Sequence, residues 1–78
     1  MNLSELKKGE CGEIIKVSAN QILKSRLNSF GITKGAKIYV IEQTMSKNTI
    51  EIRLNNTKIA LRTNEAKTIE IERRICEI

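Results

Sequence analysis

Histidine and aspartate are both absent from this 78-residue sequence. These two side chains supply the usual general base, two members of the Ser-His-Asp triad and the commonest metal ligand. Few candidates for catalysis are left without them. We therefore expect a protein that is not an enzyme.

Aromatic side chains are nearly absent as well, since Phe30 and Tyr39 are single examples and there is no tryptophan. A reader of proline-rich peptides needs an aromatic groove, which this composition cannot supply. Nucleic-acid binding by a small barrel usually relies on aromatic stacking too. It stays open as the alternative function, because 14 lysines and arginines against nine glutamates give a net charge of +5.

Long hydrophobic runs are also missing. The longest apolar stretch is the four residues Ile38–Ile41, whereas a helix that crosses a bilayer needs roughly 20 apolar residues. The first six residues lack the basic region, apolar run and cleavage site of a secretory signal. We expect a cytoplasmic protein without a membrane span of its own.

The sequence holds only two cysteines, Cys11 and Cys76, near opposite ends of the chain. Their spacing matches neither a disulfide framework nor a redox motif, so we expect reduced thiols, with a staple between the two ends as the alternative. Cys11, flanked by Glu10 and Glu13, is the one candidate metal ligand. Two or three scattered ligands fall short of the four that structural zinc requires. We predict no metal site and no cofactor, and the four glycines form no phosphate-binding pattern.

Aliphatic residues dominate what is present, with 13 isoleucines, six leucines and two valines. This bias favours strands. A first strand follows Gly12 over residues 13–17, and apolar residues then alternate with polar ones in four further segments after Gly35. Asn55-Asn56 lies between two of these segments and is typical of a tight hairpin turn. The alternating residues are Ile38 and Val40, then Ile50, Ile52 and Leu54, then Ile59 and Leu61, then Ile69 and Ile71.

One segment has a helical period instead. Its apolar stripe consists of Ile22, Leu23, Leu27 and Phe30. Ser18 or Asn20 can cap its start, and Gly31 can end it by adopting a positive φ.

Five short strands and one early helix predict a mainly β fold, a small SH3-like barrel of about five strands with one short α-helix after the first strand. Closure of the sheet removes edges that short antiparallel strands otherwise expose. The main competitor is an OB-fold, whose helix usually follows the third strand rather than the first. We expect one domain over residues 1–78, since this length supports one core.

The order of these features resembles the FeoA family. The resemblance rests on Leu3-x-x-Leu-x-x-Gly9, on Gly12-x-Ile-x-x-Val17, and above all on the segments RLNSFGITKGAKIYV and IALRTNEAKTIEI. Lys34 departs from the family, in which a proline commonly precedes the glycine. The resemblance implies an SH3-like barrel and an accessory role beside FeoB, a ferrous-iron transporter with a cytoplasmic GTP-binding domain. It implies docking to this partner rather than catalysis.

If docking is the function, the helix and the turn after it are the least repetitive part of the chain and the best candidate surface. We predict a partner-binding site there, with the apolar Leu27 also a candidate for the core. The predicted residues are Lys24, Arg26, Leu27, Ser29, Thr33 and Lys34. Self-association is a further option, because strand edges and the apolar Ile75 and Ile78 lie near the end of the chain.

Overall fold

The computed structural model describes residues 1–44 and 46–76. It contains five strands, with one helix of nine residues after the first strand and two short helical turns. In chain order the elements are η1 (Leu3–Glu5), β1 (Cys11–Val17), α1 (Gln21–Ser29), β2 (Lys37–Thr44), β3 (Thr49–Leu54), β4 (Thr57–Arg62), α2 (Thr63–Ala66) and β5 (Ile69–Arg74).

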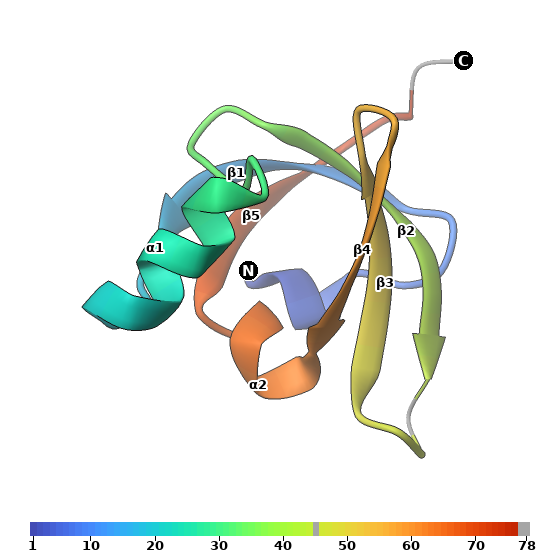
Figure 1. Cartoon of the computed structure of the whole chain (residues 1–78). Helices are drawn as coiled ribbons and strands as arrows, with labels where there is room; N and C mark the ends of the chain where they lie inside the picture. Colours follow the sequence, from blue (N-terminus) through green and yellow to red (C-terminus); the bar gives the residue numbers. More distant parts are fainter. Residues whose placement is uncertain (45, 77–78) are drawn as a thin grey trace.

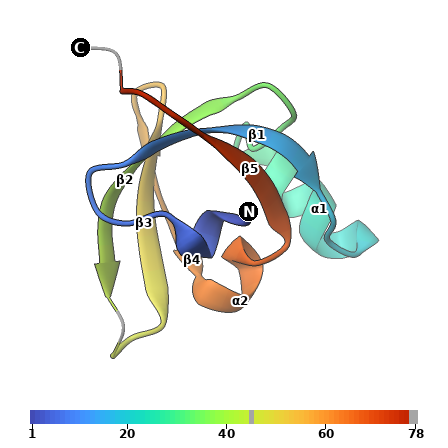
Figure 2. The ribbon, with the colours of Figure 1, turned by 180° about the vertical axis from the view of Figure 1, so that it is seen from behind.

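The strands form one antiparallel sheet in the order β4-β3-β2-β1-β5. Bulges between Ile14 and Lys16 in β1 and between Val40 and Glu42 in β2 bend the sheet. It curls into a small barrel, with α1 beside one end of β1 (Figure 1). From behind, β1 and β5 run side by side above η1 and α2 (Figure 2). The predicted mainly β barrel with a helix after its first strand is confirmed.

The core consists of the apolar residues that alternate along the strands, as the period of two predicts. Leu3 of η1, Leu6 directly after it and Ala66 of α2 fill the open side of the curled sheet and are completely buried. The helix α1 contributes only Leu27 to the core. The buried hydrophobic residues are Leu3, Leu6, Ile14, Leu27, Ile32, Ile38, Val40, Ile50, Ile52, Leu54, Ile59, Leu61, Ala66, Ile69 and Ile71.

Two predicted turns lie where the sequence places them. The β3–β4 hairpin turns at Asn55 and Asn56, and only Asn55 adopts a positive φ, of 58°. Gly31 ends α1 with a φ of 89°, a conformation that costs other residues energy because of their Cβ atom. This turn brings the chain from α1 back towards β2.

The predicted apolar stripe of α1 is only partly correct. Leu27 is buried and Leu23 is partly buried against the core. Ile22 is 85% exposed and Phe30 is 43% exposed. The helix rests on the barrel along a narrow line through Leu23 and Leu27, so residues on either side of that line face away from the core.

The prediction of two reduced thiols is wrong for this structure, in which Cys11 and Cys76 form a disulfide. The antiparallel register of β1 and β5 places Cys11 opposite Arg74. Cys76 follows two residues later, and the two Cα atoms lie 5.3 Å apart, within the range that a disulfide spans. The alternative of a staple between the two ends is confirmed.

Among residues 1–44 and 46–76, no helix is both long and apolar enough to cross a membrane.

Candidate docking site

An open groove runs between the second half of β1, the helix α1 and the loop that leads to β2. Its volume is about 690 Å³. We call it the α1 groove. It is lined by Ile15, Lys16, Val17, Gln21, Lys24, Ser25, Asn28, Ile32, Thr33 and Lys34.

The helical wall of the α1 groove is a polar stripe. Gln21, Lys24, Ser25 and Asn28 line the groove and are spaced i, i+3, i+4 and i+7, which places them on one face of a helix. The helix begins where it does because Asn20 caps it, its Oδ1 accepting a hydrogen bond of 2.8 Å from the backbone N–H of Leu23. The cap therefore determines the turn in which this stripe starts.

The opposite wall is the second half of β1, where β2 no longer pairs with it. The strand β2 pairs with β1 only along Cys11–Glu13. The loop before β2 then makes the last contacts, in which Gly35 N–H donates to the carbonyl of Ile14 at 2.7 Å and Ile14 N–H donates to that of Ala36 at 2.9 Å. Beyond Ile14, β1 pairs with β5 on its other side, and within the described chain no strand pairs with 15–17 on the groove side.

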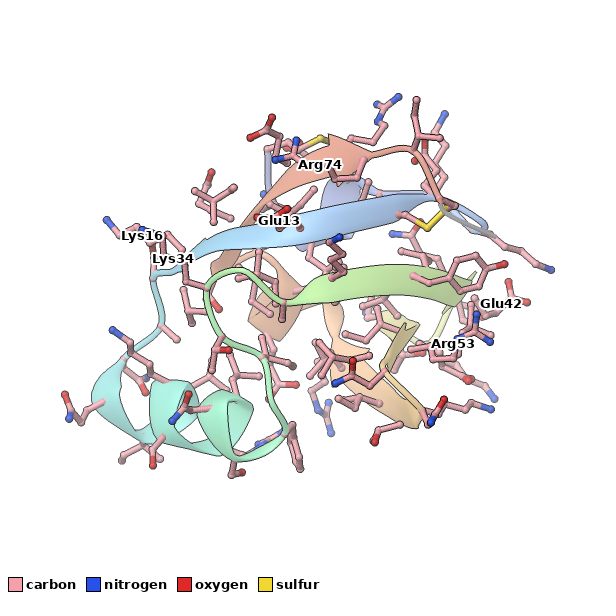
Figure 3. The ribbon with its side chains drawn as sticks, turned by 90° about the horizontal axis from the view of Figure 1, so that it is seen from above. Glu13, Lys16, Lys34, Glu42, Arg53 and Arg74 are labelled. Carbon is pink, nitrogen blue, oxygen red and sulfur yellow. A yellow bond between two sulfur atoms is a disulfide. The ribbon has the colours of Figure 1, made fainter. Side chains whose placement is uncertain are left out.

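Three lysines give the α1 groove its charge. Lys16 comes from β1, Lys24 from α1 and Lys34 from the loop, and all three are exposed. Figure 3 shows Lys16 and Lys34 next to each other at the end of β1 near α1. No acidic residue lines the groove, and among the described residues none of the three takes part in an ion pair of 4 Å or less. The groove is therefore a site of uncompensated positive charge.

Of the eleven other lysines and arginines, five have a carboxylate of a described residue within 4 Å, namely Lys8, Arg26, Lys58, Arg73 and Arg74. Lys58 Nζ lies 3.0 Å from Glu51 Oε2 on the neighbouring strand. On β5, Arg74 contacts both Glu72 and Glu13. The hydrogen bond and the charge of the Arg74 guanidinium lower the pKa of Glu72, and Glu72 in return raises the pKa of Arg74.

The structure brings together three of the six residues that the sequence predicts as a partner-binding site. Lys24, Thr33 and Lys34 all line the α1 groove. The other three lie elsewhere. Leu27 is completely buried in the core, the alternative predicted for it from the sequence.

Arg26 and Ser29 serve the helix rather than the groove. Arg26 Nη2 lies 2.9 Å from Glu65 Oε2, an ion pair that ties α1 to α2. Glu65 also accepts a 3.0 Å hydrogen bond from the backbone N–H of Arg62 at the start of α2. The Ser29 hydroxyl donates to the carbonyl of Arg26 at 2.6 Å. Neither residue lines the groove.

Sequence reasoning missed Lys16, together with the polar helix stripe. The stripe had a signal, because Gln21, Lys24, Ser25 and Asn28 have helical spacing within the predicted helix. Lys16 had no such signal, since its place in the groove depends on where β2 leaves β1. That point is set by contacts between residues distant in sequence.

A second pocket, of about 430 Å³, lies at the opposite end of β1, beside the disulfide. Its lining residues include Cys11, Cys76, Tyr39 and Arg53. The Arg53 guanidinium lies 5.0 Å from the centre of the Tyr39 ring, so a cation already covers this aromatic face.

The disulfide also removes the candidate metal ligand of the sequence, because the sulfur of Cys11 is bonded to Cys76 and is no thiolate. Within residues 1–44 and 46–76, no cluster of three or more Cys, Asp or Glu side chains could hold a metal ion.

Comparison with known proteins gives consistent matches. Residues 1–73 match the model of the FeoA domain. A protein of Campylobacter jejuni, named "Putative Fe(2+) transport protein A", is 39% identical over 71 residues, which cover 91% of this chain and 96% of that protein. These matches extend over nearly the whole barrel.

Solved structures of FeoA proteins have the same fold. The solution structure of a FeoA protein from Chlorobium tepidum has a TM-score of 0.89 and 32% identity, covering 100% of this chain and 74% of that one. The crystal structure of FeoA from Stenotrophomonas maltophilia, complexed with zinc and described as an SH3 domain protein, has a TM-score of 0.81 and 26% identity, covering 92% of this chain and 89% of that one. The predicted SH3-like fold is confirmed.

Proposed function

This chain belongs to the FeoA family of ferrous-iron transport, and from that premise we propose that it is a cytoplasmic accessory protein that docks onto the FeoB transporter. It acts by contact and not by catalysis. Its docking surface is the α1 groove. The protein of S. maltophilia is described as a candidate activating factor of ferrous-iron transport, and activation by a small barrel requires such a contact.

The observation that carries the proposal is the set of three lysines in the α1 groove. Lys16, Lys24 and Lys34 come from three separate elements and converge on one open surface without an acidic neighbour in its lining. Converging like charges destabilise the free protein slightly, because they repel one another. A binding partner that supplies the opposite charge gives this arrangement a use.

A non-catalytic role is supported by the chemistry of the side chains. The chain has no histidine or aspartate. Seven of its glutamates lie within 4 Å of a lysine, an arginine or the N-terminal amine, namely Glu10, Glu13, Glu42, Glu51, Glu65, Glu70 and Glu72. The polar side chains that line the α1 groove are amides, hydroxyls and lysines, with no carboxylate to act as a base.

Titration of the labelled protein with the cytoplasmic GTP-binding domain of FeoB, and separately with the whole transporter in detergent, tests the proposal. We expect saturable binding to at least one of them. The variant Lys16→Gln/Lys24→Gln/Lys34→Gln should bind more weakly, whereas Lys7→Gln/Lys47→Gln/Lys67→Gln, which has the same net charge, should bind as the unmodified chain does. Absence of binding to both targets at high micromolar concentration would exclude direct docking.

The disulfide allows a separate test of the cytoplasmic location. Cytoplasmic reductants keep most protein thiols reduced, so this location predicts that Cys11 and Cys76 are largely free thiols in growing cells. Rapid acid quenching followed by a maleimide that adds mass would show two modified cysteines. A pair that is fully oxidised in growing cells would contradict the location.

A further inference from the structure

We propose that the α1 groove binds an extended, acidic segment of a protein partner, which lies along the free edge of β1 while its carboxylates contact Lys16, Lys24 and Lys34. The inference rests on the proposed function, in which this partner is the transporter. It adds the chemistry and the conformation of the segment that is bound.

The unpaired edge of β1 determines the conformation. Along 15–17, the described structure places a strand only on the β5 side. An unpaired edge presents backbone N–H and C=O groups to which an extended segment adds by hydrogen bonding. Three strand residues span roughly 10 Å, so a segment of about four residues lies alongside them.

The charges determine the composition of the segment. Lys16 lies on the strand wall of the groove, Lys24 on the helix wall, and Lys34 on the loop at its end. An extended segment that runs between the two walls therefore meets a positive charge on either side. Alternate side chains of a strand lie on the same face, so carboxylates on alternate residues form one charged face of the segment, which the long, flexible side chains of the three lysines can contact.

One apolar residue within the α1 groove suggests an anchor. Ile15 is 39% exposed, because it follows the buried Ile14 and its side chain points away from the core. The bulge between Ile14 and Lys16 keeps Lys16 exposed as well. An aliphatic residue of the bound segment that covers Ile15 removes apolar surface from water. We expect a segment in which acidic and aliphatic residues alternate.

The lining favours such a peptide over a nucleic acid. Binding of single-stranded nucleic acid depends on aromatic faces for base stacking, and no aromatic residue lines the α1 groove. Tyr39 lies at the other end of β1, under Arg53. Phe30 ends α1 but does not line the groove. Amide and hydroxyl groups of Gln21, Ser25 and Asn28 suit the backbone of a peptide.

A peptide titration tests the inference on the full chain. The probe is the blocked peptide Glu-Val-Glu-Val-Glu-Glu, added to the ¹⁵N-labelled protein while amide chemical shifts are recorded at low and at moderate salt. We expect shifts confined to β1 residues 15–17, α1 and the loop at 32–34, and affinity that falls as salt rises. The peptide Gln-Val-Gln-Val-Gln-Gln should bind at least tenfold more weakly.

The groove variant Lys16→Gln/Lys24→Gln/Lys34→Gln should reduce affinity for the acidic peptide about tenfold, since each exposed ion pair contributes a factor of a few. The control Lys7→Gln/Lys47→Gln/Lys67→Gln should change it less than twofold. Equal losses in the two variants, shifts centred elsewhere, no shifts at millimolar peptide, or tighter binding of a single-stranded oligonucleotide would each overturn the inference.

The same two variants separate this inference from the proposed function. If the FeoB domain binds and only the groove variant weakens it, while the acidic peptide does not bind, the groove is the docking site but the acidic extended segment is wrong. If neither the peptide nor FeoB binds, docking itself is wrong. If both bind and compete with each other, both statements hold.

Discussion

The barrel and the helix α1 differ in how far they bury their apolar side chains, although both are built from the same few residue types. Of the 15 buried hydrophobic residues in the part of the chain that the structure describes, 14 belong to the barrel and its turns, and α1 contributes only Leu27. Barrel residues such as Ile52 are completely buried, whereas Ile22 on α1 is 85% exposed. The contrast indicates that stability resides in the barrel, so α1 is free to carry polar residues for a partner.

Few contacts hold α1 in place. Besides Leu27, it depends on the partly buried Leu23, the cap at Asn20 and the ion pair between Arg26 and Glu65. An exposed ion pair contributes at most about 1 kcal/mol. Loss of any single contact of this kind should leave the barrel folded, unlike loss of a residue at its centre.

The largest effect is expected from two isoleucines that occupy the two regions. Ile52→Ala should lower the free energy of unfolding by about 4 kcal/mol, because it leaves a cavity in the barrel. Ile22→Ala should change it by less than about 0.5 kcal/mol, since the side chain is already in water. Urea denaturation followed by circular dichroism measures both. Similar losses in the two variants would break the comparison. Ile52→Val, with a smaller expected loss of about 1 kcal/mol, serves if Ile52→Ala does not fold.

Removal of the disulfide should lower the free energy of unfolding by about 3 kcal/mol. The bond links residues 65 positions apart, so it restricts nearly the whole unfolded chain. Denaturant unfolding of Cys11→Ser/Cys76→Ser and of the oxidised protein measures the difference in the free energy of unfolding.

Because the bond lies at the opposite end of β1 from the α1 groove, FeoB binding by the folded double variant should be unchanged. A loss of binding that exceeds the unfolded fraction would show that the two ends of β1 are coupled.

Gly31 connects α1 to the barrel, and Gly31→Ala should lower the free energy of unfolding by about 2 kcal/mol. It has a φ of 89°, and a Cβ added there would lie only 3.0 Å from Leu54 Cδ2 in the barrel. Gly35 has nearly the same φ but no atom within 4 Å of its added Cβ. Gly35→Ala should therefore lower the free energy of unfolding by only about 1 kcal/mol, because alanine is less stable than glycine in the left-handed conformation. Equal losses would show that the contact with Leu54 relaxes.

A small effect is expected at the cap of α1. Asn20→Ala removes the acceptor for the N–H of Leu23 and should lower the free energy of unfolding by about 1 kcal/mol. Asn20→Asp should retain the cap. Hydrogen exchange should accelerate most at the first amides of α1 in Asn20→Ala, and in β2 and β3 by no more than the roughly fivefold that a global loss of about 1 kcal/mol produces. Acceleration in the barrel as large as that in α1 would contradict the separation of the two regions.

Most of the barrel could be predicted because its signals are local. Alternation along Ile50, Ile52 and Leu54 specifies a strand with one buried face, and Asn55 marks the hairpin that follows. The position of the helix and its end at Gly31 likewise depend on neighbouring residues. Each of these features is decided within a few residues of the chain.

The candidate site could be predicted only in part, because its geometry depends on distant pairings. Lys24 and Lys34 lie in the predicted segment, but their neighbour Lys16 joins them only because β2 leaves β1 after Glu13. The disulfide has the same cause, since it follows from the register of β1 with β5. The ion pair of Arg26 with Glu65 of the short helix α2 also joins residues distant in sequence, and α2 has no clear period in the sequence.

Chemical-shift mapping with the FeoB domain tests the central claim most directly. The ¹⁵N-labelled protein is titrated with the unlabelled GTP-binding domain of FeoB, and amide shifts are assigned along the chain. Our account predicts that the largest shifts lie in the α1 groove, at Lys16, Lys24, Thr33 and Lys34. Shifts that centre on the β3–β4 hairpin or on the disulfide pocket, with the groove unchanged, would contradict it.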